Sequence, residues 1–152
     1  SGTHCKTESG GSEGMGSSRW RVQNEMKHKP SLSSLKRKLD QAFSRFIRLR
    51  DADEGGMGIC VTCGEVRSLQ AGHWIPRQHL AVRWDERNCH GQCAACNCWG
   101  HGKLIDYTIF MQSNYGPQVV DEIMSLKRTT VKKTRQDYET LLNRFREPRN
   151  ES

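Results

Sequence analysis

The sequence predicts a small α+β fold in which helices at both ends flank a central segment of short strands. Residues 34–50 and the residues after 103 place apolar side chains at helical spacing, whereas residues 59–84 form short β-branched and aromatic pieces separated by turns. Two cysteine pairs with C-x2-C spacing accompany the strand-like segment. With 152 residues, of which 34% are hydrophobic, the chain suffices for one domain, and its small core would benefit from a cross-link.

Four segments follow from these patterns. Residues 1–30 are rich in Gly, Ser and charged residues without an apolar period, so a flexible tail is expected, with no role for His4 or Cys5. The remaining segments are an amphipathic helix at 31–52, a central core at 57–104, and a C-terminal helical extension at 105–149.

The first predicted helix has two faces of different character. Ser31 or Ser34 can cap it. Its apolar stripe, which would pack on the rest of the domain or on a second subunit, consists of Leu35, Leu39, Ala42, Phe43, Phe46 and Leu49. Its other face carries one acid, Asp40, among the bases Lys36, Arg37, Lys38, Arg45, Arg48 and Arg50. That face is either an ordinary solvated surface or a surface that contacts phosphates, and the pattern favours neither.

The C-terminal extension predicts three helical pieces. The first, residues 103–115, carries Leu104, Ile105, Thr108, Ile109 and Met111. Gly116 can end this helix and Pro117 can open the next. The last helix is expected from Thr134, where "TRQD" fits a capping box with Asp137, and its packing residues are Tyr138, Leu141, Leu142 and Phe145.

The charge of the chain favours a polyanionic partner. The formal net charge is +7 at pH 7, and the segment "KRTTVKKTR" at 127–135 places five basic residues in nine. Nucleic acid is the natural first expectation, although charge alone is weak evidence. No run of eighteen apolar residues and no signal-like amino terminus occurs in the sequence. We therefore expect no membrane association and a cytoplasmic location.

Two cysteine pairs predict one structural zinc site. In a reducing compartment, seven cysteines are better explained by metal than by disulfides. The pairs Cys60/Cys63 and Cys93/Cys96 each have the spacing that lets two thiolates from one turn reach a single ion, and Gly64 follows the first pair. Four thiolates close the coordination sphere, so this zinc would be structural. Cys89 and Cys98 remain as small buried hydrophobic residues or spare thiols.

A second set of residues resembles a nuclease motif. His73 is followed by Asn88, Asn97 and His101 in the pattern H-x14-N-x8-N-x3-H, and Asn97 comes directly after the second cysteine pair. This pattern resembles the HNH (ββα-metal) nucleases in their zinc-containing form. The resemblance implies a ββα-metal core over residues 57–104 and metal-dependent hydrolysis of phosphodiesters.

Phosphodiester hydrolysis explains why such residues are needed. A neutral imidazole at the end of a strand, His73, can deprotonate water. Asn88 can orient His73 through hydrogen bonds that tie the returning loop to the strand. Asn97 and His101, one turn apart on the opening helix, can share one catalytic ion, Mg²⁺ or Mn²⁺. Arg77 and Arg83 in the intervening loop are the candidates to hold the phosphate.

The motif departs from its usual form at one position. Gly72 stands where an Asp or His often precedes the base and helps to bind the metal. The ion would then take His90 or Asp85 as a further ligand, or rely on phosphates and water.

A closer resemblance covers residues 34–147. The stretches "LKRKLDQAFSRFIRLRD", "CVTCG", "QAGHWIPRQHLAVRWDERNCHGQCAACNCWGHG" and "YGPQVVDEIMSLKR" resemble the NinG (Rap) family of lambdoid phage recombination proteins. The family also has AGH at the position of Gly72. This resemblance implies an endonuclease that acts on branched DNA, such as Holliday junctions and D-loops, in the cytoplasm of the bacterial host.

The sequence thus predicts a structure-selective DNA endonuclease, with a homodimer as one possible assembly. An HNH enzyme that nicks linear duplex and a zinc-containing DNA-binding protein without catalysis are the alternatives. Contacts to the DNA backbone are expected from Arg77, Arg83, Lys36, Arg37, Arg45, Lys127, Arg128, Lys132, Lys133 and Arg135.

Overall fold

The computed structural model describes residues 29–146 of the chain. Contacts divide the chain into two units, Ser1–Ser31 and Leu32–Ser152, and the described helices and strands belong to the second unit. The predicted tail at 1–30, with His4 and Cys5, lies outside the described residues except for its last two positions. The elements are α2 (Leu32–Asp51), β1 (Met57–Ile59), β2 (Val66–His73), the 3-10 turn η1 (Glu86–Asn88), β3 (Cys89–Cys93), the π-helical turn η2 (Ala95–Trp99), α3 (Leu104–Lys127) and α4 (Arg135–Arg146).

The three strands form one antiparallel sheet in the order β1-β2-β3. In the central pair His73 lies opposite Cys89, and Gly72 lies opposite His90. The third strand was not predicted, because "CHGQC" contains no β-branched or aromatic residue. All five of its residues are buried, so pairing with β2 and burial on both faces give this segment its strand conformation.

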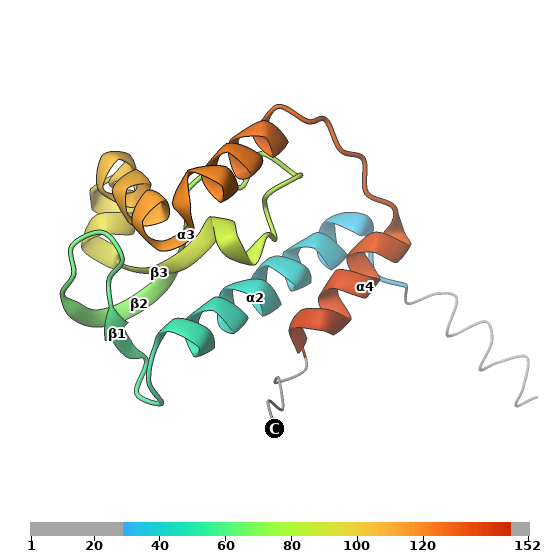
Figure 1. Ribbon diagram of the computed structural model, residues 1–152. Helices are drawn as coiled ribbons and strands as arrows, with labels where there is room; N and C mark the ends of the chain where they lie inside the picture. Colours follow the sequence, from blue (N-terminus) through green and yellow to red (C-terminus); the bar gives the residue numbers. More distant parts are fainter. Residues whose placement is uncertain (1–28, 147–152) are drawn as a thin grey trace, which may run out of the picture. The chain divides into compact units, whose positions relative to one another are not determined.

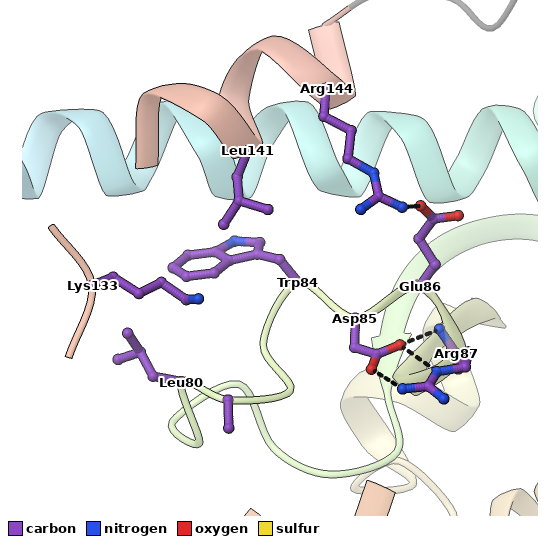
Figure 2. Close-up of a pocket in the computed structure, with 9 residues that line it drawn as sticks. Leu80, Trp84, Asp85, Glu86, Arg87, Lys133, Leu141 and Arg144 are labelled. Atoms are coloured by element: carbon purple, nitrogen blue, oxygen red, sulfur yellow. Dashed lines mark hydrogen bonds and ion pairs between the residues drawn. The ribbon is translucent and has the colours of Figure 1, made fainter. Parts of the chain in front are cut away.

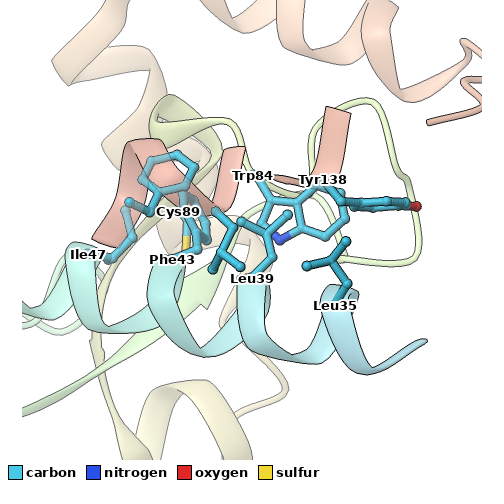
Figure 3. Close-up of a cluster of buried hydrophobic side chains, with 9 residues drawn as sticks. Leu35, Leu39, Phe43, Ile47, Trp84, Cys89 and Tyr138 are labelled. Atoms are coloured by element: carbon cyan, nitrogen blue, oxygen red, sulfur yellow. The ribbon is translucent and has the colours of Figure 1, made fainter. Parts of the chain in front are cut away.

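Helices α2 and α4 lie side by side on one face of the sheet, and α3 lies on the other (Figure 1). The apolar stripe of α2 points into a cluster that also receives side chains from α4 and from the loop before β3 (Figure 3). Ile47 is buried in this stripe, whereas Leu49, which the helical pattern had placed there, is exposed. Because the cluster buries Leu35, Leu39 and Phe43 within the chain, this stripe is not available to form a dimer.

Local signals at the C-terminal helices are confirmed. Thr134 and Asp137 exchange hydrogen bonds as a capping box, since the Asp137 amide donates to Thr134 Oγ1 and the Thr134 amide donates to Asp137 Oδ2. Gly116 has φ 79° and ψ 169°, so α3 is two helical pieces joined at Gly116 and Pro117.

The first piece of α3 buries a different face from the one that its apolar residues suggest. Tyr107 and Met111 are buried, while Leu104, Ile105 and Ile109 are exposed.

No helix in the described range 29–146 is long and apolar enough to cross a membrane.

Candidate functional site

The four cysteines predicted to bind zinc come together in space. Cys60 and Cys63 flank the turn after β1, Cys93 ends β3, and Cys96 lies in η2. Their sulfur atoms all lie within 4.8 Å of one another, and the Sγ atoms of Cys63 and Cys93 are 3.9 Å apart. A tetrahedral zinc with Zn–S bonds of about 2.3 Å requires sulfurs about 3.8 Å apart. The donor set and its spacing therefore fit one structural zinc ion.

The backbone around the cysteines suits thiolates. The Cys93 amide donates a hydrogen bond to the Cys60 sulfur, and Gly64 has the left-handed φ of 74° that the turn requires. Burial would raise the pKa of the Cys60 thiol, but the hydrogen bonds from Thr62 and the backbone lower it to about 6. The two remaining cysteines of this region differ: Cys89 is buried in the α2 cluster, and Cys98 is exposed.

A cavity of about 380 Å³ lies next to the segment that follows the last of the four clustered cysteines, and several of the predicted site residues line it. His73 reaches it from the end of β2, Arg77 from the following loop, and Asn97 and His101 from η2 and the turn after it. The full lining is Asp40, Phe43, Ser44, Ala71, His73, Pro76, Arg77, Asn97, His101 and Gly102. Four predicted residues from three separate segments thus border one cavity.

The hydrogen bonding of His73 defines which of its nitrogens is free. Nε2 lies 2.9 Å from the carbonyl oxygen of Arg83, and because a carbonyl can only accept, Nε2 carries the proton. Nδ1 therefore keeps its lone pair. Burial lowers the pKa of His73, and the charges of Arg77 and Arg83 lower it further, so the ring is neutral at pH 7. This is the state that a general base requires.

Arg83 is held in place and does not extend into the cavity as a free cation. Its guanidinium makes a two-point ion pair with Asp40 of α2, at 2.9 and 2.6 Å, and also donates to the carbonyl of Arg77. Asp40 accepts a further hydrogen bond from the Trp84 indole at 3.0 Å. Arg83 was predicted to hold phosphate, but its guanidinium is already bound to Asp40 and to the Arg77 carbonyl. Arg77, the other predicted phosphate ligand, lines the cavity.

Asp40 is a site residue that the sequence analysis missed. It is the single acid on an otherwise basic helix face, and that isolation was the available signal. By fixing Arg83, it also fixes the carbonyl that holds His73.

Asn88 does not line the cavity but organises the loop that follows His73. Its Oδ1 accepts from the Ile75 amide at 2.8 Å, and its Nδ2 donates to the carbonyls of Ile75 and Val82 at 2.9 and 3.1 Å. The side chain is fully buried. Asn88 thus connects Ile75 and Val82 of the loop that follows His73 to the start of β3, and its role in orienting His73 stays a prediction.

The relation between Asn97 and His101 differs from the prediction. They are not one turn apart on a continuous helix, because η2 ends at Trp99 and His101 adopts φ 51° in the following turn. Gly102 and Lys103 also have positive φ, which a right-handed helix cannot accommodate. Both side chains nevertheless line the cavity. Asn97 Nδ2 donates to Gln70, so its Oδ1 is the atom that could bind a cation.

The position of Gly72 explains the missing ligand. A Cβ atom at Gly72 would lie 2.1 Å from the Gln92 side-chain oxygen, on the face of the sheet opposite to His73. A longer side chain there would displace the buried Gln92 and would not reach the cavity.

Neither proposed substitute ligand lies at the cavity. Tyr107 donates to the Gly72 carbonyl at 2.8 Å and therefore accepts from His90 Nδ1, while His90 Nε2 faces the Tyr115 hydroxyl at 2.7 Å. Asp85 pairs with Arg87 and caps η1. In the described part of the chain, the cysteine cluster is the one group of three or more His, Cys, Asp or Glu side chains that could share an ion.

A second cavity, of about 480 Å³, lies between the loop before β3 and α4 (Figure 2). Lys133, one of the predicted DNA-binding residues, lines it together with Trp84 and Leu141. The other charged residues around it are paired, Arg144 with Glu86 and Arg87 with Asp85. The remaining predicted cations Lys36, Arg37, Arg45, Lys127, Arg128 and Lys132 lie on α2, at the end of α3 and in the segment before α4, while Arg135 pairs with Glu139.

Comparison with known proteins identifies the relatives of this chain. Protein ninG of Escherichia phage 933W is 40% identical over 88 residues, which are 56% of this chain and 42% of that relative. Proteins ninG of Escherichia phage lambda and Salmonella phage P22 are each 40% identical over 88 residues, which cover 41% of each relative. The chain thus spans less than half the length of these relatives. No solved structure matches the chain. A family model described as Bacteriophage Lambda NinG protein matches residues 6–151, and the chain therefore belongs to the NinG family of lambdoid phage proteins.

Proposed function

We propose that this protein is a metal-dependent DNA endonuclease of the HNH (ββα-metal) type that acts on branched DNA during phage recombination. The observation that carries the proposal is the cavity that a neutral His73, with its Nδ1 unprotonated, lines together with Arg77, Asn97 and His101. The order of the elements supports it, because His73 ends one strand, Asn88 precedes the next, and Asn97 lies in the helical turn that follows.

The residues suggest a division of labour in the reaction. Nδ1 of His73 accepts a proton from water, and the water oxygen forms a bond to phosphorus. The bond from phosphorus to the 3′ oxygen breaks, and that oxygen takes a proton from solvent, which leaves 3′-hydroxyl and 5′-phosphate ends. A divalent ion, Mg²⁺ or Mn²⁺, at Asn97 Oδ1 and His101 would supply positive charge beside the phosphate. Arg77 would contact the phosphate directly.

Two features support DNA as the substrate. The formal net charge is +7, and basic residues gather on α2 and in the segment between α3 and α4. Such side chains contact the DNA backbone without reading its sequence. The preference for branched DNA is inferred from membership of the NinG family together with the resemblance to recombination endonucleases.

The decisive experiment incubates end-labelled four-way junction and matched linear duplex with the protein and Mg²⁺ or Mn²⁺, followed by a denaturing gel. We expect cleavage of the junction. His73→Ala should lower the cleavage rate by on the order of 10²-fold with nearly unchanged junction affinity, because a general base acts on the transition state.

His79→Ala is the matched control, since His79 lies six residues along the chain and does not line the cavity. Cleavage by His73→Ala at the rate of His79→Ala would remove His73 from the role of base. Equal cleavage of junction and duplex would favour a nicking enzyme. Binding without any cleavage would favour a zinc-containing DNA-binding protein.

A further inference from the structure

A large aromatic side chain of this protein is exposed to solvent beside the candidate site. Trp99 is 82% exposed, whereas Trp74 and Trp84 are buried. An indole combines a large apolar surface with one N–H donor, and tryptophan is enriched where proteins contact other molecules. Trp99 therefore marks a contact surface that the cavity does not include.

The chain around Trp99 is held rigidly. Cys96, three residues earlier, is one of the four clustered cysteines, and Asn97 is hydrogen-bonded to Gln70. After Trp99 the backbone passes through His101 and Lys103, both with positive φ, a conformation that costs non-glycine residues on the order of 1 kcal/mol or more each. The contacts of Cys96 and Asn97 and the left-handed backbone at His101 and Lys103 thus restrict the position of the segment that carries the exposed indole.

Trp99 lies between two residues of the cavity. Asn97 and His101 are each two positions away, so their Cα atoms lie within about 7 Å of the Cα of Trp99. The indole itself lines the neighbouring hollow on the side of the cysteine cluster, together with Lys103. Because the indole faces this hollow and not the cavity, a strand whose phosphate occupies the cavity would have to continue over η2 for one of its nucleotides to meet Trp99.

A cation without an acidic partner in the described part of the chain lies beside Trp99 and suits the phosphate of a nucleotide. Lys103 makes no ion pair among the described residues, and Arg67, also on this hollow, pairs with Glu65. Aromatic rings next to cations form the usual platform for unpaired bases, because every base has a face on which an indole can stack. Leu104, Ile105 and Ile109 of α3 are also exposed.

We propose that Trp99 stacks on the unstacked face of a nucleobase next to the candidate cleavage site and thereby provides the preference for branched over linear DNA. In a continuous duplex each base is already stacked on its neighbours, so the indole gains no contact. At the centre of an open four-way junction, or where a splayed duplex becomes single-stranded, a base has a face without a stacked neighbour. This inference rests on the proposed function for its substrate, but it concerns binding and not cleavage.

The test measures binding in the His73→Ala background, so that cleavage does not interfere. Fluorescence anisotropy would measure the affinity for a labelled four-way junction, a splayed duplex and a linear duplex. The protein that keeps Trp99 would be compared with the Trp99→Ala and Trp99→Phe variants. Trp99→Ala should weaken binding to both branched DNAs by about 10-fold and binding to linear duplex by less than about 2-fold, as expected for one lost stacking contact. Trp99→Phe should restore most of the affinity. A 5-iodouracil placed at the branch should cross-link to Trp99 on irradiation.

Ile109→Ala is the matched control, because it removes another exposed apolar side chain that lines neither the cavity nor the hollow beside Trp99. Its DNA affinity should not change. Equal losses on branched and linear DNA, or no loss, would overturn the proposal. Light scattering would show whether the protein self-associates. If Trp99→Ala abolished self-association but left DNA binding unchanged, the surface around Trp99 would bind a second copy of the chain and the proposal would be wrong. Absence of cleavage by the unmodified protein would contradict the proposed function and leave these binding results valid.

Discussion

At the scale of single residues, the paired strands β2 and β3 each carry one neutral histidine, and the two histidines have different roles. His73 donates a hydrogen bond from Nε2 to the Arg83 carbonyl, which leaves Nδ1 unprotonated, and its side chain lines the cavity. His90 uses both ring nitrogens on tyrosine hydroxyls and has none to offer a metal or a substrate. The same residue type is therefore chemically available on one face of the sheet and purely structural on the other.

His90 predicts a pH dependence of stability. Burial, with a smaller contribution from Arg50, lowers its pKa to about 4 from an ordinary value of about 6.5. Between these values the unfolded chain binds the proton and the folded chain does not, so the free energy of unfolding falls as the pH is lowered. We expect a loss on the order of 1 kcal/mol between pH 7 and pH 5.5 from this residue, measured by urea denaturation with zinc present.

His90→Gln should remove that part of the pH dependence, although the variant will be less stable at pH 7. An unchanged slope of stability against pH in His90→Gln would show that His90 does not contribute. His79→Gln serves as the comparison, since His79 lies in the loop outside the sheet.

At the scale of elements, α2 supports the loop that holds the candidate base. Asp40 on α2 fixes Arg83, and the Arg83 carbonyl fixes His73. The ring of Phe43, one turn further along α2, lies with its centroid 6.1 Å from that of His73. The helix thus does more than fill the core, because it positions a residue of the cavity.

Asp40→Asn should loosen this arrangement. The substitution removes the charge that balances a largely buried guanidinium, and we expect a loss of about 1–3 kcal/mol in stability. The ¹⁵N NMR spectrum should also show that His73 is no longer restricted to the tautomer protonated at Nε2. Asp121→Asn, at an exposed position of α3, should alter neither observable. A single His73 tautomer retained in folded Asp40→Asn would refute the positioning role of Asp40.

At the scale of the whole molecule, the described residues form three apolar clusters, and the third includes three of the four cysteines of the candidate metal site. The first joins α2 with α4 and the second lies against α3. The third consists of Leu69 and three cysteines, Cys60, Cys93 and Cys96. Without an ion, one leucine and a few thiols bury too little apolar surface to hold β1, β2 and η2 together.

Loss of the metal should therefore unfold the sheet region. Cys93→Ser should abolish stoichiometric zinc, measured by elemental analysis, and reduce the cooperativity of thermal unfolding. Cys98→Ser should keep both, since Cys98 is exposed and outside the cluster. A Cys93→Ser protein that stays fully folded without zinc would contradict the structural role of the site.

Features that depend on neighbouring residues could be predicted from the sequence alone. The stripe of α2, the capping box at Thr134 and the break at Gly116 follow from helical spacing and local hydrogen bonds. The two cysteine pairs could likewise be predicted to meet, because the spacing within each pair already fits one ion and four thiolates complete its coordination.

Features that depend on distant partners required the folded chain. Strand β3 forms because β2 supplies its hydrogen bonds, although its own residues do not favour a strand. His101 meets Asn97 through left-handed turn residues and not through a helix. The pairing of Arg83 with Asp40, 43 positions away, and of His90 with Tyr107 and Tyr115 depends on long-range packing that no local spacing encodes. Spacing could therefore name the residues of the cavity, whereas only the tertiary contacts showed which of their atoms are free.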